Sequence, residues 1–352
     1  MMNGSTPLLE IRDLHVRFKI YEGELKVLNG VDLRIDEGEK VGLVGETGCG
    51  KTTTIKSVLR VLPMPPARII KGEILYKGKD ILKMRRAEIP SLRRGEISAI
   101  FQDPLTSLNP VFTIGQQLGD IIKFSLKNQG MKRVKRENIR LNAASLLKET
   151  GMPDPERILK SYPVQLSGGM RQRVCISEAL RVNVNLLMAD EPTTNLDVTI
   201  QDQILRRLDD LVEKRGTSIL LITHSLGVVR NLTHRVYIMY AGNIIETAET
   251  RELFKNPLHP YTQGLLKTVP RLTGEGVSKG IPGRIPNYLD PPRGCRYHPR
   301  CDHRMPICKK DRPPLYVMEL DRKASSDPAI SSGGRIKEDH RVACYLYRSR
   351  AE

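Results

Sequence analysis

Apolar and polar residues alternate in two stretches near the beginning of the chain, as they do in half-buried β-strands. The first stretch runs from Leu9 to Val16 and the second from Val31 to Ile35, with a turn at residues 37–40 after it. Alternation places one face of each strand on a core and the other toward solvent. We therefore predict a small antiparallel sheet in this part of the chain.

Three later stretches are short and almost wholly apolar, as in strands that are buried on both faces of a parallel sheet. They are residues 41–44, 186–189 and 218–222. Amphipathic helical patterns accompany them, from Thr52 to Arg60 and from Ile200 to Arg215. Parallel strands that alternate with helices indicate an α/β core.

Two other regions differ from this core. From about residue 89 to residue 165, apolar residues recur at helical spacing among many lysines and arginines, which predicts a helical insertion between core strands. From about Pro270 the composition shifts to Pro, Gly, Arg and Cys with few apolar periods. This shift predicts a separate, loop-rich appendage.

The first candidate chemistry lies between the strand at residues 41–44 and the helix after it. There the sequence fits G-x-x-x-x-G-K-[ST], the phosphate-binding P-loop. Its glycines let backbone N–H groups surround phosphate oxygens at the start of a helix. The residues expected around the nucleotide are Gly45, Glu46, Thr47, Gly48, Cys49, Gly50, Lys51, Thr52 and Thr53. We expect Lys51 to bind the β- and γ-phosphates and the Thr52 hydroxyl to bind Mg²⁺.

Two acidic residues follow the second apolar strand directly. Asp190, at the end of that strand, would lie beside the P-loop and hold Mg²⁺. The adjacent Glu191 would reach past the γ-phosphate and polarise an attacking water as general base. Together with the P-loop, this pair predicts hydrolysis of a nucleoside triphosphate.

Leu166-Ser167-Gly168-Gly169-Met170 resembles the LSGGQ-type signature of ATP-binding cassette (ABC) ATPases, with Met170 in place of the usual glutamine. The resemblance covers about residues 8–254. It implies a RecA-like P-loop core with an antiparallel β subdomain and a helical subdomain. In this family the signature caps the γ-phosphate of the nucleotide held by the other subunit, so Ser167, Gly168 and Gly169 would act in trans.

The same resemblance assigns the remaining motifs. Gln102 matches the Q-loop residue that touches Mg²⁺ and the attacking water, and Asp197 matches the D-loop residue that crosses the dimer interface. His224 matches the switch histidine near the γ-phosphate. The implied catalytic group is therefore Glu191, His224, Gln102 and Lys51. The Mg²⁺ ligands would be Thr52, Gln102 and Asp190.

One aromatic side chain near the N-terminus is expected to stack on the adenine ring. Phe18 and Tyr21 both lie in or near the loop between the first two predicted strands. Either aromatic face could bind a base. The sequence leaves open which of the two does so.

The C-terminal part contains four of the six cysteines, Cys295, Cys301, Cys308 and Cys344. Their spacing is not the paired C-x2-C of a zinc ribbon, and four thiolates can hold zinc or an iron–sulfur cluster. Segments around them, such as residues 256–266, resemble the region after the cassette in oligopeptide/dipeptide importer ATPases. That resemblance implies a [4Fe-4S] cluster, with zinc as the alternative. It divides the chain into a nucleotide-binding domain at 7–255 and a C-terminal region at 256–352.

Composition and charge limit the class of protein. Hydrophobic residues make up 39% and charged residues 28% of the 352 residues, and no apolar run approaches the ~20 residues of a membrane span. With no visible secretory signal, we expect a cytosolic protein with reduced thiols. The net charge of +17 fits either nucleic acid phosphates or the anionic face of a membrane.

The importer resemblance implies a set of partners. These are a second ABC ATPase subunit (usually a different chain), two membrane permease subunits and an external substrate-binding protein. The chain would lie peripherally on the cytoplasmic face of the membrane, with no nucleic acid partner. Other members of this importer family take part in the transport of nickel or oligosaccharides. Apolar residues of the helical insertion would receive the permease, namely Val111, Phe112, Ile114 and Ile121.

Two other functions stay open at this point. A soluble ABC ATPase that acts on nucleic acid would account for the charge. A regulatory iron–sulfur protein with a degenerate nucleotide site would account for the cysteines, although the intact Lys51, Gln102, Glu191 and His224 oppose it.

Overall fold

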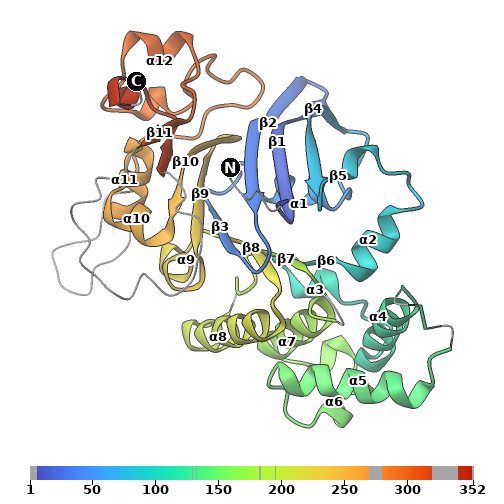
Figure 1. Ribbon diagram of the computed structural model, residues 1–352. Helices are drawn as coiled ribbons and strands as arrows, with labels where there is room; N and C mark the ends of the chain where they lie inside the picture. The colour runs from blue at the N-terminus through green and yellow to red at the C-terminus, as the bar shows by residue number, and fades with distance from the viewer. Residues whose placement is uncertain are drawn as a thin grey trace.

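The computed structural model describes residues 6–128, 130–131, 133–181, 184–194, 196–268, 280–318 and 340–350. Two β-sheets stand beside each other, and the helices gather around the larger one (Figure 1). The green helices form a group at one end of the molecule, and the orange-to-red C-terminal segment lies at the opposite corner. None of the helices in the described ranges combines the length and the apolar character that a membrane span needs.

The smaller sheet is antiparallel and has the strand order β2-β1-β4-β5. Its strands are β1 (Leu9–Ile20), β2 (Gly23–Ile35), β4 (Ala67–Tyr76) and β5 (Lys79–Asp80). The alternating residues of β1 and β2 bury one face of this sheet, as the pattern predicts. That face shares a hydrophobic cluster with α1 (Lys51–Val58), the helix after the P-loop. The predicted antiparallel sheet is therefore confirmed.

The larger sheet has the order β11-β12-β10-β9-β3-β8-β7-β6. Its strands are β3 (Lys40–Val44), β6 (Ile97–Ile100), β7 (Leu186–Asp190), β8 (Ser218–Thr223), β9 (Arg235–Tyr240), β10 (Asn243–Glu249), β11 (Tyr316–Met318) and β12 (His340–Val342). The strand β3 lies parallel to β8 on one side and β9 on the other. Because β3, β7 and β8 are parallel, their carboxyl ends meet at one edge of the sheet, where ligands bind in open α/β sheets.

The remaining helices lie around the two sheets (Figure 1). They are α2 (Ile89–Gly95), α3 (Pro104–Ser107), α4 (Ile114–Asn128), α5 (Arg136–Glu149), α6 (Pro155–Lys160), α7 (Gly168–Ala179), α8 (Val198–Arg215), α9 (Leu226–Leu232), α10 (Thr250–Lys255), α11 (Pro260–Lys267) and α12 (Pro306–Lys310). Short 3₁₀ turns occur at Ile81–Lys83, Pro163–Gln165, His298–Arg300 and Tyr345–Arg350. The helices α4 to α7 share a hydrophobic cluster of their own, which gives the helical region a core separate from that of the sheets.

The helical region differs from the sequence-based expectation at its beginning. The predicted insertion starts near residue 89, but β6 pairs in parallel with β7 and is an outer strand of the core sheet. The continuous run of helices starts only after β6. Its four residues, Ile97 to Ile100, are too short a stretch for periodicity to separate strand from helix.

The expected separate C-terminal appendage is not supported. The strand β12 pairs with β10, with Glu246 opposite Val342, so the C-terminal region extends the core sheet. Tyr240 of β9 also packs against Tyr261 and Tyr297, with ring centroids 4.7 and 5.1 Å apart. Composition did not reveal this shared core because the apolar residues of the C-terminal region are dispersed along the sequence and form one cluster with those of the cassette.

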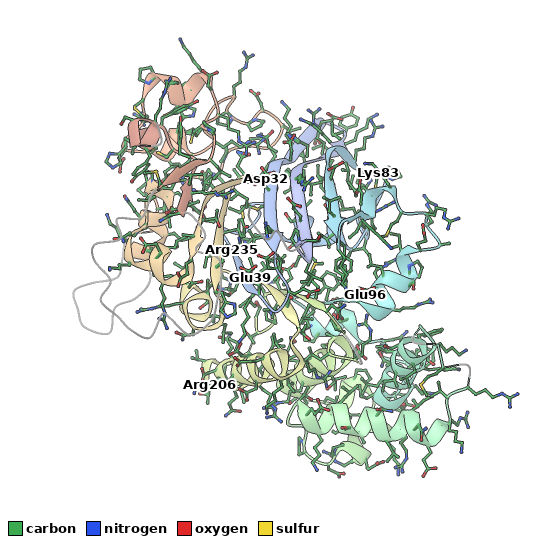
Figure 2. The ribbon with its side chains drawn as sticks, in the orientation of Figure 1. Asp32, Glu39, Lys83, Glu96, Arg206 and Arg235 are labelled. Carbon is green, nitrogen blue, oxygen red and sulfur yellow. The ribbon has the colours of Figure 1, made fainter. Side chains whose placement is uncertain are left out.

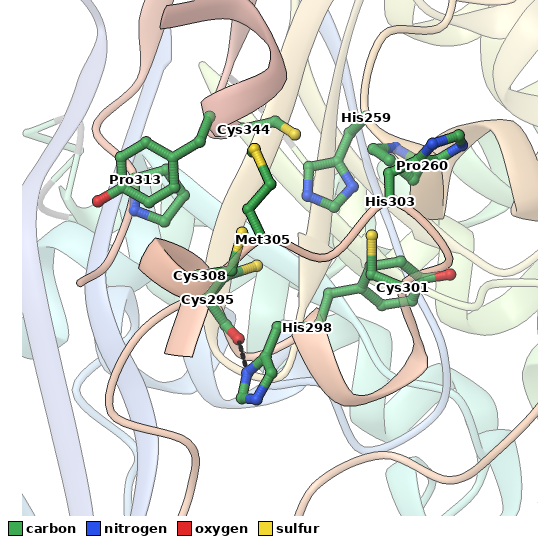
Figure 3. Close-up of a pocket in the computed structure, with 12 residues that line it drawn as sticks. His259, Pro260, Cys295, His298, Cys301, His303, Met305, Cys308, Pro313 and Cys344 are labelled. Carbon is green, nitrogen blue, oxygen red and sulfur yellow. Dashed lines mark hydrogen bonds between the residues drawn. The ribbon is translucent and has the colours of Figure 1, made fainter. Parts of the chain in front are cut away.

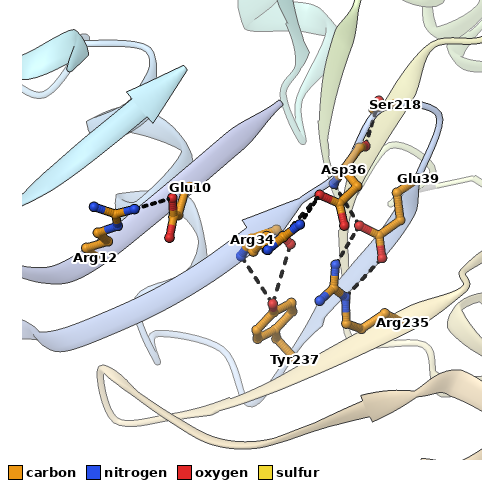
Figure 4. A network of polar contacts seen from close by, with 8 residues as sticks. All are labelled: Glu10, Arg12, Arg34, Asp36, Glu39, Ser218, Arg235 and Tyr237. Atoms are coloured by element: carbon orange, nitrogen blue, oxygen red, sulfur yellow. Dashed lines mark hydrogen bonds and ion pairs between the residues drawn. The ribbon is translucent and has the colours of Figure 1, made fainter. Parts of the chain in front are cut away.

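Buried ion pairs and exposed ion pairs coexist in this fold. Charged side chains such as Lys83 and Arg206 point away from the ribbon, whereas Glu39 and Arg235 lie between the strands (Figure 2). Arg235 donates two hydrogen bonds to Glu39, at 2.9 and 2.6 Å, and the two side chains are only 7% and 14% exposed (Figure 4). This pair joins β9 to the turn before β3.

Removal of Arg235 should destabilise the fold strongly. Arg235→Ala leaves the largely buried Glu39 carboxylate without its cationic partner, and we expect a loss of about 3 kcal/mol in the free energy of unfolding, measured by urea titration. The matched control is Arg12→Ala. Arg12 pairs with Glu10 at 2.8 Å, but its side chain is 54% exposed, so its removal should leave the unfolding midpoint almost unchanged. Equal losses for the two variants would contradict this reading.

Candidate functional site

The P-loop leaves the centre of the larger sheet, between the fully buried β3 and the start of α1. Gly50 occupies the N-cap position of α1 with φ at 113°, a backbone conformation that residues with a side chain rarely adopt. A Cβ atom on Gly45 would lie 2.1 Å from the carbonyl oxygen of Met239. Both glycines are therefore required by the turn, and Thr47 and Gly48 remain exposed at its tip.

Lys51 is buried, and its ammonium group folds back onto the P-loop. Its Nζ donates to the carbonyl oxygens of Gly45, at 2.7 Å, and Glu46, at 3.1 Å. It also lies 3.8 Å from the sulfur of Cys49. The positive charge is thus held inside the ring of backbone atoms that the motif assigns to phosphates.

Asp190 ends β7 next to the start of α1. The Thr52 hydroxyl hydrogen-bonds to its carboxylate, and burial raises the pKa of Asp190 above its usual value. The Thr52 and Asp190 oxygens are hard donors of the kind that Mg²⁺ prefers. Two of the three predicted magnesium ligands, Thr52 and Asp190, therefore lie together.

Glu191 is the point at which the other predicted catalytic residues meet. Its Oε2 accepts a hydrogen bond from Gln102, at 3.2 Å, and its Oε1 lies 3.2 Å from Nδ1 of His224. The Thr194 hydroxyl also donates to Oε2, at 2.9 Å. The φ of Glu191 is 48°, an uncommon value for a non-glycine residue that costs backbone energy. The backbone of Glu191 is therefore strained, and both of its carboxylate oxygens have side-chain partners.

The predicted trans-acting residues stand apart from this group, at the beginnings of two helices. Ser167 caps α7 and Asp197 caps α8, each through its side-chain oxygen. In the ranges that the structure describes, these hydrogen bonds stay within their own helices. Ser167, Gly168 and Asp197 are exposed, and Gly169 is partly exposed and packs near Ile200.

The two candidates for adenine stacking differ in environment. Tyr21 lies at the turn between β1 and β2 with its side chain fully exposed. Phe18 is partly buried and packs against the core between the sheets. A base can reach the open ring of Tyr21 more easily than the packed ring of Phe18.

A cavity of about 630 Å³ opens beneath the site, between the core sheet and the signature helix α7. Thr52, Gln102 and Asp190 line one side, and Glu178 and Arg181 of α7 line another. The Oε1 atom of Glu178 is buried without a hydrogen-bond partner among the described residues. Burial raises the pKa of Glu178 to about 7, against the opposing effect of Arg181.

Several residues contact the site although no sequence motif assigned them to it. Thr194 touches the proposed general base, and three C-terminal residues touch the P-loop: Tyr261, Tyr288 and Arg300. Arg300 and Glu46 are 254 positions apart, and no local motif links such distant positions. Only the folded chain reveals these contacts.

The four C-terminal cysteines line one small cavity of about 10 Å³, together with His259, His298 and Met305 (Figure 3). Cys295 and Cys308 are joined through their backbones, with the Cys295 N–H donating to the Cys308 carbonyl at 2.9 Å. Burial raises the pKa of Cys295 to about 11 and that of Cys344 to about 12. The four thiols are free and line the same cavity.

The expected metal centre is not shown by this arrangement. Within the described ranges, no group of three or more His, Cys, Asp or Glu side chains is placed to hold a metal ion. The four cysteines lie around one cavity, but neither the iron–sulfur cluster nor zinc is shown there.

Comparison with known proteins identifies the family. Residues 28–194 match the family described as ABC transporter, and residues 245–308 match the oligopeptide/dipeptide transporter C-terminal region. The oligopeptide transport ATP-binding protein OppD of Bacillus subtilis (strain 168) is 44% identical, over 88% of this chain and 86% of the relative. The dipeptide transport ATP-binding protein DppD of the same strain is 41% identical, over 98% and 96%. The chain belongs to the oligopeptide/dipeptide family of ABC transporter ATP-binding proteins.

Solved structures agree with this assignment. The dimeric ABC cassette MJ0796 in a post-hydrolysis state with ADP and phosphate is 26% identical, with a TM-score of 0.61, over 69% of this chain and 99% of that chain. The predicted family and its α/β P-loop fold with an antiparallel sheet are confirmed. This ABC protein is an ATPase coupled to transport, and the alternative of a cassette acting on nucleic acid is not favoured, since the family match continues through the C-terminal region.

Glu178 should make the stability of this ABC protein depend on pH. Its pKa is about 7 in the folded chain against 4.5 as the reference, so the folded state binds the proton more tightly. Its contribution to stability is therefore lost as the pH rises from about 4.5 to about 7. At pH 8, Glu178→Gln should be more stable than the wild type by about 1–3 kcal/mol.

Thermal unfolding from pH 4.5 to pH 8 tests this expectation. The gain should disappear near pH 4.5, where both proteins are neutral at this position. Glu137→Gln, at an exposed position in the first turn of α5, is the control and should follow the wild type at each pH. A gain that does not change with pH would contradict the role of charge.

Proposed function

We propose that this ATPase drives the uptake of oligopeptides or dipeptides. Its curated relatives are named for the transport of these substrates, and the C-terminal match belongs to the same transporter class. The proposal covers a nucleotide-binding domain at 7–255, with a helical subdomain within about 89–165, and a C-terminal region at 256–352.

The observation that carries the catalytic proposal is the contact of Glu191 with both Gln102 and His224. We propose that Glu191 accepts the proton of the attacking water as general base, while Gln102 orients that water and His224 contacts the γ-phosphate. Lys51 would leave the Gly45 and Glu46 carbonyls to bind the β- and γ-phosphates. A Mg²⁺ ion held by Thr52, Gln102 and Asp190 would neutralise charge on the phosphate oxygens.

The nucleotide would be held by the whole P-loop and completed by a second subunit. Residues 45–53 surround the phosphates in this proposal, and Tyr21 stacks on adenine in preference to Phe18. The exposed helix starts at Ser167, Gly168 and Asp197, with Gly169, would face the γ-phosphate bound by the partner cassette. MJ0796, the solved relative described above, is dimeric with ADP and phosphate bound.

Further partners follow from the transporter class. We propose two permease subunits, an external substrate-binding protein and a second ABC ATPase chain, with this chain on the cytoplasmic face of the membrane. Val111 and Phe112 are 69% and 47% exposed before α4 and are available to a permease. Ile114 is buried inside the helical core, and Ile121 is partly buried. The proposed permease contact is therefore limited to Val111 and Phe112.

We further propose that the cysteine pocket accepts a [4Fe-4S] cluster, with zinc as the less favoured occupant. Four thiols that line one cavity supply the kind and the number of donors that such a cluster takes. The preference for the cluster over zinc rests on the resemblance of the cysteine pattern to that of the oligopeptide/dipeptide importer ATPases. The cluster would tie together a region that contains little core of its own.

Substitution of Glu191 tests the catalytic proposal. Glu191→Gln retains the shape of the side chain but cannot accept a proton, so ATP hydrolysis should fall by about 10²–10⁴-fold while ATP binding persists. Phosphate release by the chain assembled with its permease and binding protein measures the loss, and uptake of labelled peptides should stop with it. Glu137→Gln on α5 is the control. Unchanged turnover in Glu191→Gln would refute the assignment, and ATP-driven uptake of other solutes but not peptides would refute the substrate.

Anaerobic purification tests the cluster. We expect absorption near ~400 nm and about four irons per chain, both reduced in Cys301→Ser. Cys175→Ser is the control, because Cys175 is a buried cysteine of α7 outside the pocket. One zinc per chain, or no metal at all, would refute the cluster.

A further inference from the structure

The C-terminal region forms direct hydrogen bonds with the P-loop. Arg300 donates from one nitrogen to both carboxylate oxygens of Glu46, at 3.1 and 3.0 Å. The backbone N–H of Glu46 donates to the Tyr261 hydroxyl, at 3.0 Å. The Tyr288 hydroxyl donates to the carbonyl oxygen of Gly48, at 2.8 Å. Two of the four variable positions of the phosphate-binding motif are thus fixed from outside the cassette.

Arg300 is itself rigidly placed. Its side chain is only 6% exposed, and its remaining N–H groups donate to the carbonyl oxygens of Ile281 and Pro282 and to the Tyr240 hydroxyl. A guanidinium whose three nitrogens all donate hydrogen bonds loses little conformational entropy when it binds a carboxylate. Glu46 is therefore anchored to a fixed point rather than to a mobile surface side chain.

This anchor matters for the P-loop in two ways. First, the carbonyl of Glu46 holds Lys51, and its N–H is held by Tyr261, so the position of Glu46 sets the shape of the loop. Preorganisation of a binding loop lowers the cost of ordering it around a ligand. Second, the Glu46 carboxylate carries negative charge next to a site for a triphosphate, and Arg300 neutralises that charge.

We propose that Arg300 is a positioning residue for ATP binding, so that the C-terminal segment from Ile281 to Arg300 completes the nucleotide site in cis. The inference rests on the proposed assignment of ATP to the P-loop. Arg300 does not touch the reacting atoms. Its loss should weaken ATP binding and raise KM, while kcat at saturating ATP stays near the wild-type value.

The test measures binding of a fluorescent ATP analogue (MANT-ATP) to the full chain, alongside steady-state hydrolysis. Arg300→Gln should weaken binding by about tenfold, which corresponds to the loss of one good charged contact. Arg300→Lys retains the charge but loses the guanidinium N–H groups that donate to the Ile281 and Pro282 carbonyls, so it should fall between Arg300→Gln and the wild type. A further substitution, Glu46→Gln in the Arg300→Gln chain, removes the unpaired carboxylate and should restore part of the affinity.

Arg312→Gln is the matched control. Arg312 also reaches from the C-terminal region to the cassette, where it donates to the backbone carbonyls of Asn29 and Gly30 in β2. It makes no contact with the P-loop among the hydrogen bonds of the described residues. Its loss weakens the docking of the region alone, so ATP binding should stay within about twofold of the wild type.

The possible outcomes separate the inference from the function on which it rests. Lys51→Ala should abolish binding, and if it does not, the P-loop assignment itself fails. Loss with Lys51→Ala but wild-type binding in Arg300→Gln and Arg300→Lys overturns only the role of Arg300. Equal weakening by Arg312→Gln and Arg300→Gln, or no restoration by Glu46→Gln, would show general docking instead and would also overturn it.

Discussion

The structure depends on the burial of β3 between β8 and β9. All five residues of β3 are buried, and both of its neighbouring strands run parallel to it. The loop at the carboxyl end of β3 therefore leads directly into α1. The same constraint places the ends of β7 and β8 beside that loop. Asp190, Glu191 and His224 lie at the proposed nucleotide site because their strands end at the same edge, not because they are close in the sequence.

The end of β7 brings the Asp190 and Glu191 carboxylates near the positive charge of Lys51, but it does not fix the orientation of the two side chains. Short side-chain contacts supply the remainder: Gln102 and Thr194 hold one oxygen of Glu191, and His224 lies against the other. The positive φ of Glu191 shows that this position is maintained at a cost. A hydrolytic site that must close around ATP and open again benefits from one group whose direction is set by the backbone.

The sequence could predict this site because each of its motifs is local. The glycines at 45 and 50 specify a turn that only they can form, and a strand ending in Asp190 and Glu191 needs no distant information. The C-terminal region was harder to predict. The β12 strand is three residues long and joins β10 across about a hundred positions, and the tyrosine cluster has no period. Short strands and scattered aromatic residues can be assigned to a core only when the surface that they pack against is known.

The join between the C-terminal region and the cassette limits how the chain can be divided. A cassette of this kind is often treated as an interchangeable motor, with whatever follows it as an accessory. Here the second residue of the phosphate loop is hydrogen-bonded to a residue 254 positions later, and two strands at one edge of the core sheet, β11 and β12, come from the same region. Exchange between related transporters would therefore preserve function only when both parts are inherited from one parent.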